Sequence, residues 1–290
     1  MLFSKILVPV DFSRRSLGMA HYACKLGARY KAEVTLLNVI ETPCYGVPGA
    51  GLELPAFAPV LPEWRYQHEF RLDEFARTAC PDSLVSPMVV EGNPAEKIVE
   101  TAHEIGADLL TMPTHGYGAF RRLLIGSVTS KVLHDIQCPV LTGVHLECAP
   151  PMDKIHFNRV LCAVDLKRDC RRVLKWAAAF AADFDAHLTV LHVVPMPFVP
   201  SDTAFDANWF TELEQIAKKQ LSDLCGELEL TAAEARTATG SPITAAAAVA
   251  REDKADVVVI GRSTDAHLGG RLRANAYGII RQSPCPVISV

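Results

Sequence analysis

Two kinds of segment alternate along this chain. Short runs of apolar and β-branched residues predict buried strands, and longer segments with apolar residues at helical spacing predict amphipathic helices. In the first half, the predicted strands are residues 6–10, 34–39, 84–90, 107–112 and 139–144. The predicted helices between them are residues 14–30, 63–79, 94–105 and 127–136, with Ser13 and Asn93 as expected N-caps.

The same order of elements returns in the second half. Asp11 and Val39 are 28 residues apart, and so are Asp165 and Val193. Further pairs of matching segments are Gly92-Asn-Pro94 with Gly240-Ser-Pro242, Ala107-Asp108 with Ala255-Asp256, and Cys138-Pro-Val140 with Cys285-Pro-Val287. These matches indicate a tandem duplication.

The two halves differ in length after their second strand. The spacing between matching positions falls there from 154 to 148, so the first half is six residues longer. The extra length lies in residues 42–62, which are rich in proline and glycine. We expect a long loop there that acts as a lid or as a partner surface.

Strands that alternate with helices through short connections predict an α/β fold. The chain is expected to form two repeated doubly wound, Rossmann-like domains, each a parallel sheet with helices on both faces. The expected domains are residues 1–146 and 156–290, joined by a linker of residues 147–155. Ligands of such sheets bind at the carboxyl ends of the strands, so Asp11, Val39 and Met112-Pro113 are expected to converge.

The composition narrows the class of protein. With 49% apolar residues, 21% charged residues and a net charge of -4, the chain is typical of a soluble globular protein without affinity for nucleic acid. Its apolar runs are too short to span a membrane, and we predict no signal peptide. The nine cysteines show no paired spacing, which favours reduced thiols and a cytoplasmic location. The ten histidines show no metal-ligand spacing.

One stretch of the first half has the pattern of an anion site. A predicted strand ends at Met112, and the loop after it ends at Gly126-Ser127, where a helix begins. The free N–H groups of a helix N-terminus bind anions such as phosphate. Motifs of P-loop proteins, dinucleotide-binding folds and serine hydrolases do not occur, and no nucleophile, base and acid are spaced as a catalytic set. We therefore expect at most weak catalysis.

Several segments together resemble the universal stress protein family in its tandem two-domain form. They are Ile6-Leu-Val-Pro-Val-Asp-Phe-Ser13, Leu36-Leu-Asn-Val39, Thr114-His-Gly116, Leu124-Ile-Gly-Ser-Val128 and Cys138-Pro-Val140. The resemblance implies a five-stranded parallel sheet with strand order 3-2-1-4-5 in each domain. It also implies pairing through the last strands, around Val140-Leu-Thr142 and Val287-Ile-Ser289.

The resemblance also implies a site for ATP, with Mg²⁺ on its phosphates. Members of the family that bind nucleotides carry Gly-x2-Gly-x9-Gly-Ser/Thr, of which Pro113 replaces the first glycine here. If that glycine needs a positive φ or donates its N–H, Pro113 weakens binding, and if it is merely extended, Pro113 is harmless. The implied residues are Pro9, Asp11, Val39, Met112, Pro113, Thr114, Gly116, Gly126, Ser127 and Val128. From spacing alone, Asp11 could equally be a helix cap.

The second half carries an altered copy of this site. Thr264 stands where the second glycine belongs, and small residues follow in place of the last glycine and serine. The residues of this degenerate site are Asp165, Val193, Gly261, Arg273, Ala274 and Asn275. Arg262, Arg271 and Arg273 could add contacts to an anion.

The resemblance implies a stress-response regulator that binds ATP or a related adenine nucleotide in its first domain. Two alternatives stay open. One is a nucleotide-free interaction protein in which both sites have decayed, and the other is a slow ATPase. A protein partner and a homodimer beyond the intramolecular pair are also consistent with the family.

Overall fold

The computed structural model of the chain describes residues 2–41, 62–81, 85–115, 125–143, 149–167, 169–195, 207–262 and 274–290. The first domain contains, in order, β1 (Lys5–Pro9), α1 (Arg14–Tyr30), β2 (Glu33–Ile40), α2 (Pro62–Ala79), β3 (Val85–Glu91), α3 (Pro94–Ile105), β4 (Leu109–Pro113), α4 (Ser127–Asp135) and β5 (Val140–Gly143). A 3-10 helix, η1 (Met152–Lys154), follows it. The second domain contains β6 (Arg159–Val164), α5 (Cys170–Asp183), β7 (His187–Val194), α6 (Ala207–Glu227), β8 (Glu234–Thr239), α7 (Pro242–Glu252), β9 (Val257–Ile260), α8 (Ala274–Gln282) and β10 (Val287–Ser289).

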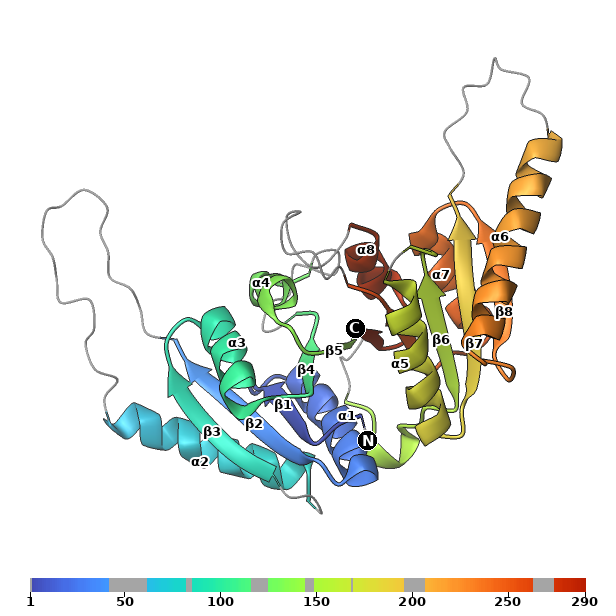
Figure 1. Cartoon of the computed structure of the whole chain (residues 1–290). Coiled ribbons are helices and arrows are strands. Elements are labelled where there is room, and N and C mark those ends of the chain that lie inside the picture. The colour runs from blue at the N-terminus through green and yellow to red at the C-terminus, as the bar shows by residue number, and fades with distance from the viewer. Residues whose placement is uncertain are drawn as a thin grey trace, which may run out of the picture.

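All ten strands belong to one sheet, in the order β3-β2-β1-β4-β5-β10-β9-β6-β7-β8 (Figure 1). Within each domain the neighbouring strands are parallel and follow the predicted 3-2-1-4-5 order. The domains meet where β5 and β10 pair antiparallel, with Leu141 opposite Ile288. The predicted fold class and the predicted pairing through the last strands are both confirmed.

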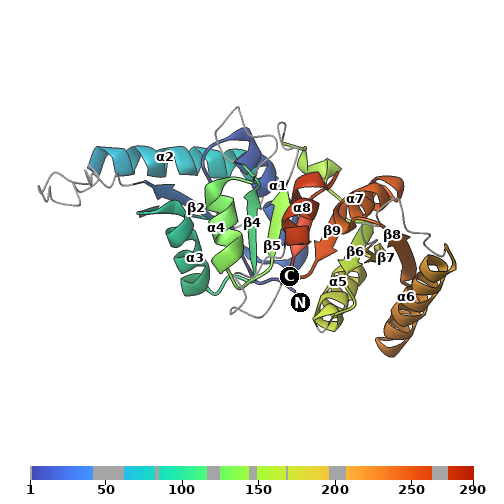
Figure 2. The same cartoon turned by 90° about the horizontal axis from the view of Figure 1, so that it is seen from above.

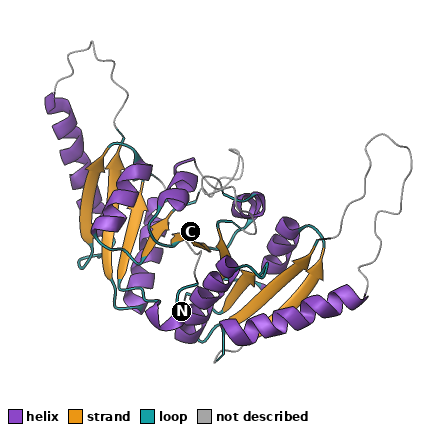
Figure 3. Ribbon diagram, turned by 180° about the vertical axis from the view of Figure 1, so that it is seen from behind, coloured by secondary structure: helices purple, strands orange, loops and turns teal. Residues whose placement is uncertain are grey.

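Helices cover both faces of each half of the sheet (Figures 2 and 3). Side chains of a strand point alternately to opposite faces, so Ile6 and Val8 of β1 join one hydrophobic cluster and Leu7 joins the other. Met19 of α1 lies in the first cluster and Ile98 of α3 in the second. Both clusters contain buried residues of both domains, so each face has a core that continues across the junction.

The predicted N-caps Ser13 and Asn93 cap α1 and α3. Ser13 Oγ accepts a hydrogen bond from the Ser16 N–H at 3.1 Å, and Asn93 Oδ1 accepts one from the Ala95 N–H at 3.1 Å. Gly106 ends α3 in the left-handed region, at φ 63°. Of the long segment after β2, only Pro62 is described, as the first residue of α2. The prediction of a loop over residues 42–62 is therefore wrong at Pro62, and residues 42–61 lie outside the described residues.

The repeated Ala-Asp pair has the same task in both domains. Asp108 Oδ2 accepts hydrogen bonds from the N–H groups of Ser4 (2.7 Å) and Lys5 (3.0 Å). Asp256 Oδ2 accepts equivalent bonds from Asn158 (2.7 Å) and Arg159 (2.9 Å). Each carboxylate therefore ties the start of a central strand to the segment before the neighbouring strand.

An aromatic cluster between α1 and α5 adds to the junction of the domains. Phe3 lies 4.9 Å from Tyr30 and 6.5 Å from Phe180 between ring centroids. The Tyr30 hydroxyl donates to Asp183 Oδ2 at 2.8 Å. Rings at such distances stabilise a contact beyond the area they bury. The domains therefore share a packed face as well as a sheet.

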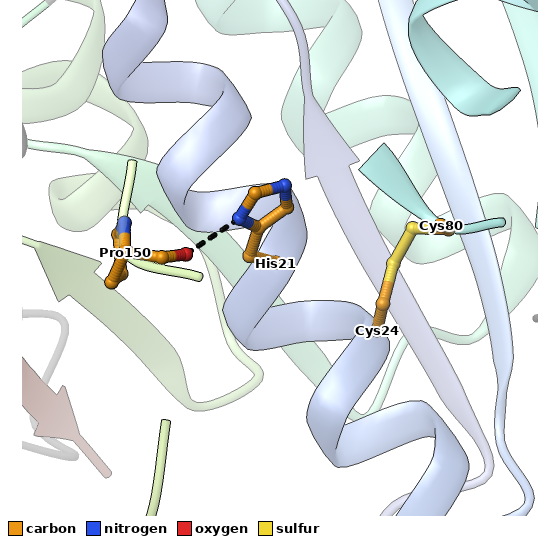
Figure 4. Close-up of a disulfide and its surroundings, with 4 residues drawn as sticks. All are labelled: His21, Cys24, Cys80 and Pro150. Atoms are coloured by element: carbon orange, nitrogen blue, oxygen red, sulfur yellow. Dashed lines mark hydrogen bonds between the residues drawn. A yellow bond between two sulfur atoms is a disulfide. The ribbon is translucent and has the colours of Figure 1, made fainter. Parts of the chain in front are cut away.

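A disulfide joins Cys24 of α1 to Cys80, the residue after α2 (Figure 4). Their Cα atoms are 5.9 Å apart, within the usual range for a bridge. The expectation of reduced thiols is therefore wrong for this pair, because the fold brings together two cysteines that are 56 residues apart. In the ranges that the structure describes, five other cysteines are free: Cys138, Cys162, Cys170, Cys225 and Cys285. Among the described residues, none of the helices is long and apolar enough to cross a bilayer.

The disulfide should stabilise the first domain. Closing a loop between residues that are 56 apart constrains the unfolded chain and should contribute about 4 kcal/mol to the free energy of unfolding. Urea unfolding with and without a thiol reductant measures this contribution. The wild-type chain should lose most of it on reduction, whereas C24A/C80A should not respond to reductant. A non-reducing peptide map without a linked Cys24–Cys80 pair would contradict the assignment.

Candidate functional site

The loop after β1 brings Asp11 to the carboxyl edge of the sheet. Asp11 Oδ1 accepts a hydrogen bond from the Ser13 N–H at 3.0 Å, and Phe12 between them has a positive φ of 62°. Ser13 is the cap of α1, so the alternative of Asp11 as the helix cap is wrong. The second domain repeats the turn, because Asp165 Oδ1 accepts from the Lys167 N–H at 3.1 Å and Leu166 has a φ of 54°.

Asn38 holds the ends of β1 and β2 together. Its amide donates to the Val10 carbonyl at 2.7 Å, and its Oδ1 accepts from Nδ1 of His68 on α2, also at 2.7 Å. Burial, together with Arg71, lowers the pKa of His68. In the second domain His192 takes the place of Asn38 and donates to the Val164 carbonyl at 2.9 Å. The sequence does not predict these hydrogen bonds, because nothing in the local pattern distinguishes Asn38 from other polar residues in strands.

Hydrogen bonds join the end of β4 to the start of α4. Pro113 is buried as the last residue of β4, in register with Gly143, and its φ is not positive. Its carbonyl accepts from the Thr129 hydroxyl at 3.0 Å, and the Thr114 carbonyl accepts from the Gly126 N–H at 2.8 Å. Pro113 therefore continues the strand, and its effect on nucleotide binding stays a prediction.

The N-terminus of α4 has no side-chain cap. Gly126 is its N-cap residue, and Ser127 and Val128 begin the helix. A Cβ atom at Gly126 would lie 3.4 Å from the Thr114 carbonyl oxygen, so the loop passes close to the strand end. The N–H groups of a first helical turn without a capping side chain suit an anion. Gly116, the other matching glycine of the motif, lies outside the described residues.

His115 lies beside this helix start. Its Nδ1 is 3.1 Å from the Thr114 hydroxyl oxygen, as expected for a histidine that forms hydrogen bonds within the loop. Burial lowers the pKa of His115, and the nearby positive charge of Arg15 lowers it further. His115 is therefore neutral at pH 7.

The second domain has a cavity of about 420 Å³ at the equivalent edge of the sheet. Asp165, Val193, Gly261 and Asn275 all line it, so the structure brings these predicted residues together. Ala274 is the first residue of α8, and Arg273 lies outside the described residues. Arg262 also lines this cavity, and its guanidinium donates to backbone carbonyls of the first domain, so its contact to an anion stays a prediction.

The described part of the chain contains no cluster of side chains that could bind a metal ion. No group of three or more histidine, cysteine, aspartate or glutamate side chains there could hold a metal ion. Mg²⁺ bound to nucleotide phosphates is a different arrangement, because phosphate oxygens supply part of its coordination. The expected Mg²⁺ therefore stays a prediction.

The fold and the edge described above define a class of tandem α/β proteins with a candidate anion-binding helix. The model of the universal stress protein family matches residues 2–142 and again residues 156–290. The chain therefore belongs to the universal stress protein family.

Known relatives match one half of the chain at a time. A universal stress protein of Thermus aquaticus, encoded in the QAH/OAS sulfhydrylase 3' region, is 38% identical over 142 residues, which cover 48% of this chain and 98% of the relative. The universal stress protein MJ0531 of Methanocaldococcus jannaschii is 32% identical over 141 residues, which cover 48% of this chain and 81% of the relative.

Solved structures also match the whole tandem arrangement. A universal stress protein from Archaeoglobus fulgidus aligns with a TM-score of 0.65 over 98% of this chain and 95% of that chain, at 22% identity. At this identity the likeness supports the fold alone. The two-domain arrangement therefore occurs in another member of the family.

The lowered pKa of His115 can be measured by an NMR titration of its ring protons. We expect a midpoint below the ordinary value of 6.5, because burial and Arg15 both disfavour the charged form. The R15Q variant should raise the midpoint toward 6.5, and the midpoint of His68 should not change, because Arg71 is the nearby charge there. A midpoint of His115 at or above 6.5 in the wild-type chain would contradict this electrostatic description.

Proposed function

We propose that this protein is a stress-response regulator that binds ATP, or a related adenine nucleotide, in its first domain. The observation that carries the proposal is the uncapped start of α4, where the Gly126 N–H donates to the carbonyl of Thr114, just after β4, in a sheet whose next strands are β1 and β2. In doubly wound sheets this edge is where ligands bind. Membership of the universal stress protein family supports the same reading.

Each part of the edge has a role in the proposed complex. Asp11 uses one carboxylate oxygen in its own turn, and the other would accept a hydrogen bond from the ribose. The main chain at Val39 would contact the edge of the adenine, with Pro9 and Met112 forming the floor. The N–H groups of Ser127 and Val128 would hold phosphate oxygens, with Mg²⁺ on the outer phosphates. Thr114, Gly116 and Gly126 would let the backbone come close to the nucleotide.

The proposed role is binding and not turnover. His115 is a neutral hydrogen-bonding residue with a lowered pKa, and no catalytic set was found in the sequence. Nucleotide binding would act by shifting the population of conformations, for which the segment of residues 42–61 is the candidate element. A regulator of this kind needs a partner that distinguishes the two states.

A second candidate function is a nucleotide-free interaction protein. Its support is the exposed aromatic side chains on α2, with exposed fractions of 54% for Trp64, 70% for Tyr66 and 52% for Phe70. Large aromatic residues are enriched at protein interfaces. This surface is compatible with either function, because a regulator also needs a surface that its partner contacts.

Acid extraction of the purified chain, followed by chromatography, identifies any nucleotide that co-purifies. Titration calorimetry then measures the affinity for ATP. The G126D variant should weaken ATP binding by at least about tenfold, because a carboxylate at the start of α4 repels the phosphates and accepts the N–H groups they need. A chain that neither carries nucleotide nor gives heat with ATP would favour the interaction protein instead.

Two matched variants make this test specific. G126A adds only a Cβ atom that would lie 3.4 Å from its nearest neighbour, so it should retain most of the affinity. A274D places the same charge at the start of α8 in the second domain and should leave ATP binding unchanged. If A274D abolished binding and G126D did not, the nucleotide site would belong to the second domain.

A further inference from the structure

Arg262 belongs to the second domain but contacts the first. It follows β9 and is buried, with only 5% of its surface exposed. Its guanidinium donates to the carbonyls of Ile136 at 3.1 Å, Gln137 at 3.3 Å and Cys138. These three residues connect the end of α4 to β5. Its own N–H donates to the Val290 carbonyl at 2.6 Å, which fixes the base of the side chain at the end of the sheet.

The chemistry of this contact suits a helix end. The carbonyl of Ile136, the C-cap residue of α4, lacks an intrahelical donor, and the helix dipole places partial negative charge at this end. The planar guanidinium carries several N–H donors and a permanent positive charge, so one side chain serves three successive carbonyls. Without it, the carbonyl of Ile136 would lose a hydrogen-bond donor in a buried contact, which destabilises the connection.

A second contact between the domains reaches the same helix. The hydroxyl of Tyr277 on α8 donates to the Ser130 carbonyl on α4 at 3.3 Å. Ser130 lies one turn from the N-terminus of α4, and its own N–H donates to the Gly126 carbonyl at 2.8 Å. The second domain therefore contacts α4 at its C-terminal end and near its N-terminal end.

The position equivalent to Arg262 in the first domain is Thr114, since each follows the residue at the matching strand end. The Thr114 hydroxyl donates to the Gly143 carbonyl at 3.3 Å, within its own domain. The contact is therefore directional: the second domain supplies the arginine, and the first domain supplies the helix that receives it.

We propose that Arg262 is a positioning residue through which the second domain holds the phosphate-binding helix of the first-domain site. The inference rests on the proposed function for the identity of the ligand. It assigns a task to the second domain through a residue that also lines that domain's cavity. The first-domain site would then depend on the tandem arrangement for its phosphate end.

A positioning role for Arg262 and a general loss of stability predict different changes in the affinities for ATP and adenosine. Adenosine reaches the strand ends but has no phosphates for α4 to hold. The R262M variant should therefore bind ATP about tenfold more weakly, within the roughly 2-fold to 30-fold range expected when a residue acts through such coupling. Its affinity for adenosine should equal that of the wild-type chain. R262K keeps the charge but not the planar guanidinium, so its affinity for ATP should lie between those of the wild-type chain and R262M.

The matched control is R236M, measured in the full chain. Arg236 belongs to the same domain, and its guanidinium pairs with Glu252 at 3.0 Å and with Asp253 at 2.5 Å, both within that domain. R236M should leave the affinities for ATP and adenosine unchanged. If R262M weakens adenosine and ATP equally, or if R236M has the same effect as R262M, the positioning role is wrong.

Amide hydrogen exchange tests the same inference without a ligand. In R262M, exchange should become faster across α4, beginning with Ser130, whose N–H donates to the Gly126 carbonyl, and should stay as in the wild type in R236M. If the wild-type chain does not bind ATP, the proposed function fails, and the exchange result alone decides whether Arg262 holds the helix. Unchanged exchange at residues 130–135 in R262M would overturn the inference.

Discussion

The antiparallel pairing of β5 with β10 is the contact on which the rest of the structure depends. A five-stranded parallel sheet exposes the N–H and C=O groups of its last strand, and an open edge of this kind favours association. Here Leu141 lies opposite Ile288, and the Thr142 and Ser289 hydroxyls donate to carbonyls across the junction at 3.2 and 3.4 Å. One covalent chain thereby supplies both halves of a symmetric interface, and the outer edges of the sheet are β3 and β8.

Because the two domains are copies joined in one chain, each can diverge while the shared interface is kept. The first domain retains Gly126 and Ser127 at an uncapped helix start, and the second retains Gly261 beside its cavity. At one equivalent position the copies now have different tasks, since Thr114 bonds within its own domain and Arg262 reaches across to α4. A homodimer of identical chains could not place an arginine on only one side of its two-fold axis.

Local sequence signals predicted the local structure well. The caps at Ser13 and Asn93, the repeat and the strand order all follow from short patterns or from family resemblance. The features that were missed depend on contacts between distant residues or on backbone conformation. Cys24 and Cys80 come together only when α2 packs beside α1, and Arg262 finds its acceptors 124 to 126 residues away. The positive φ of Phe12 was also missed, because a bulky residue rarely adopts that conformation.

The central claim is that a single tandem molecule holds one adenine-nucleotide site, in the domain whose helix start is preserved. The most direct test is the stoichiometry of binding, measured by equilibrium dialysis of the full-length chain against labelled ATP in the presence of Mg²⁺. We expect saturation at about one nucleotide per chain, because only the first domain is proposed to bind ATP. Saturation at about two would show that the second domain has kept its site, and no retained nucleotide would contradict the claim altogether.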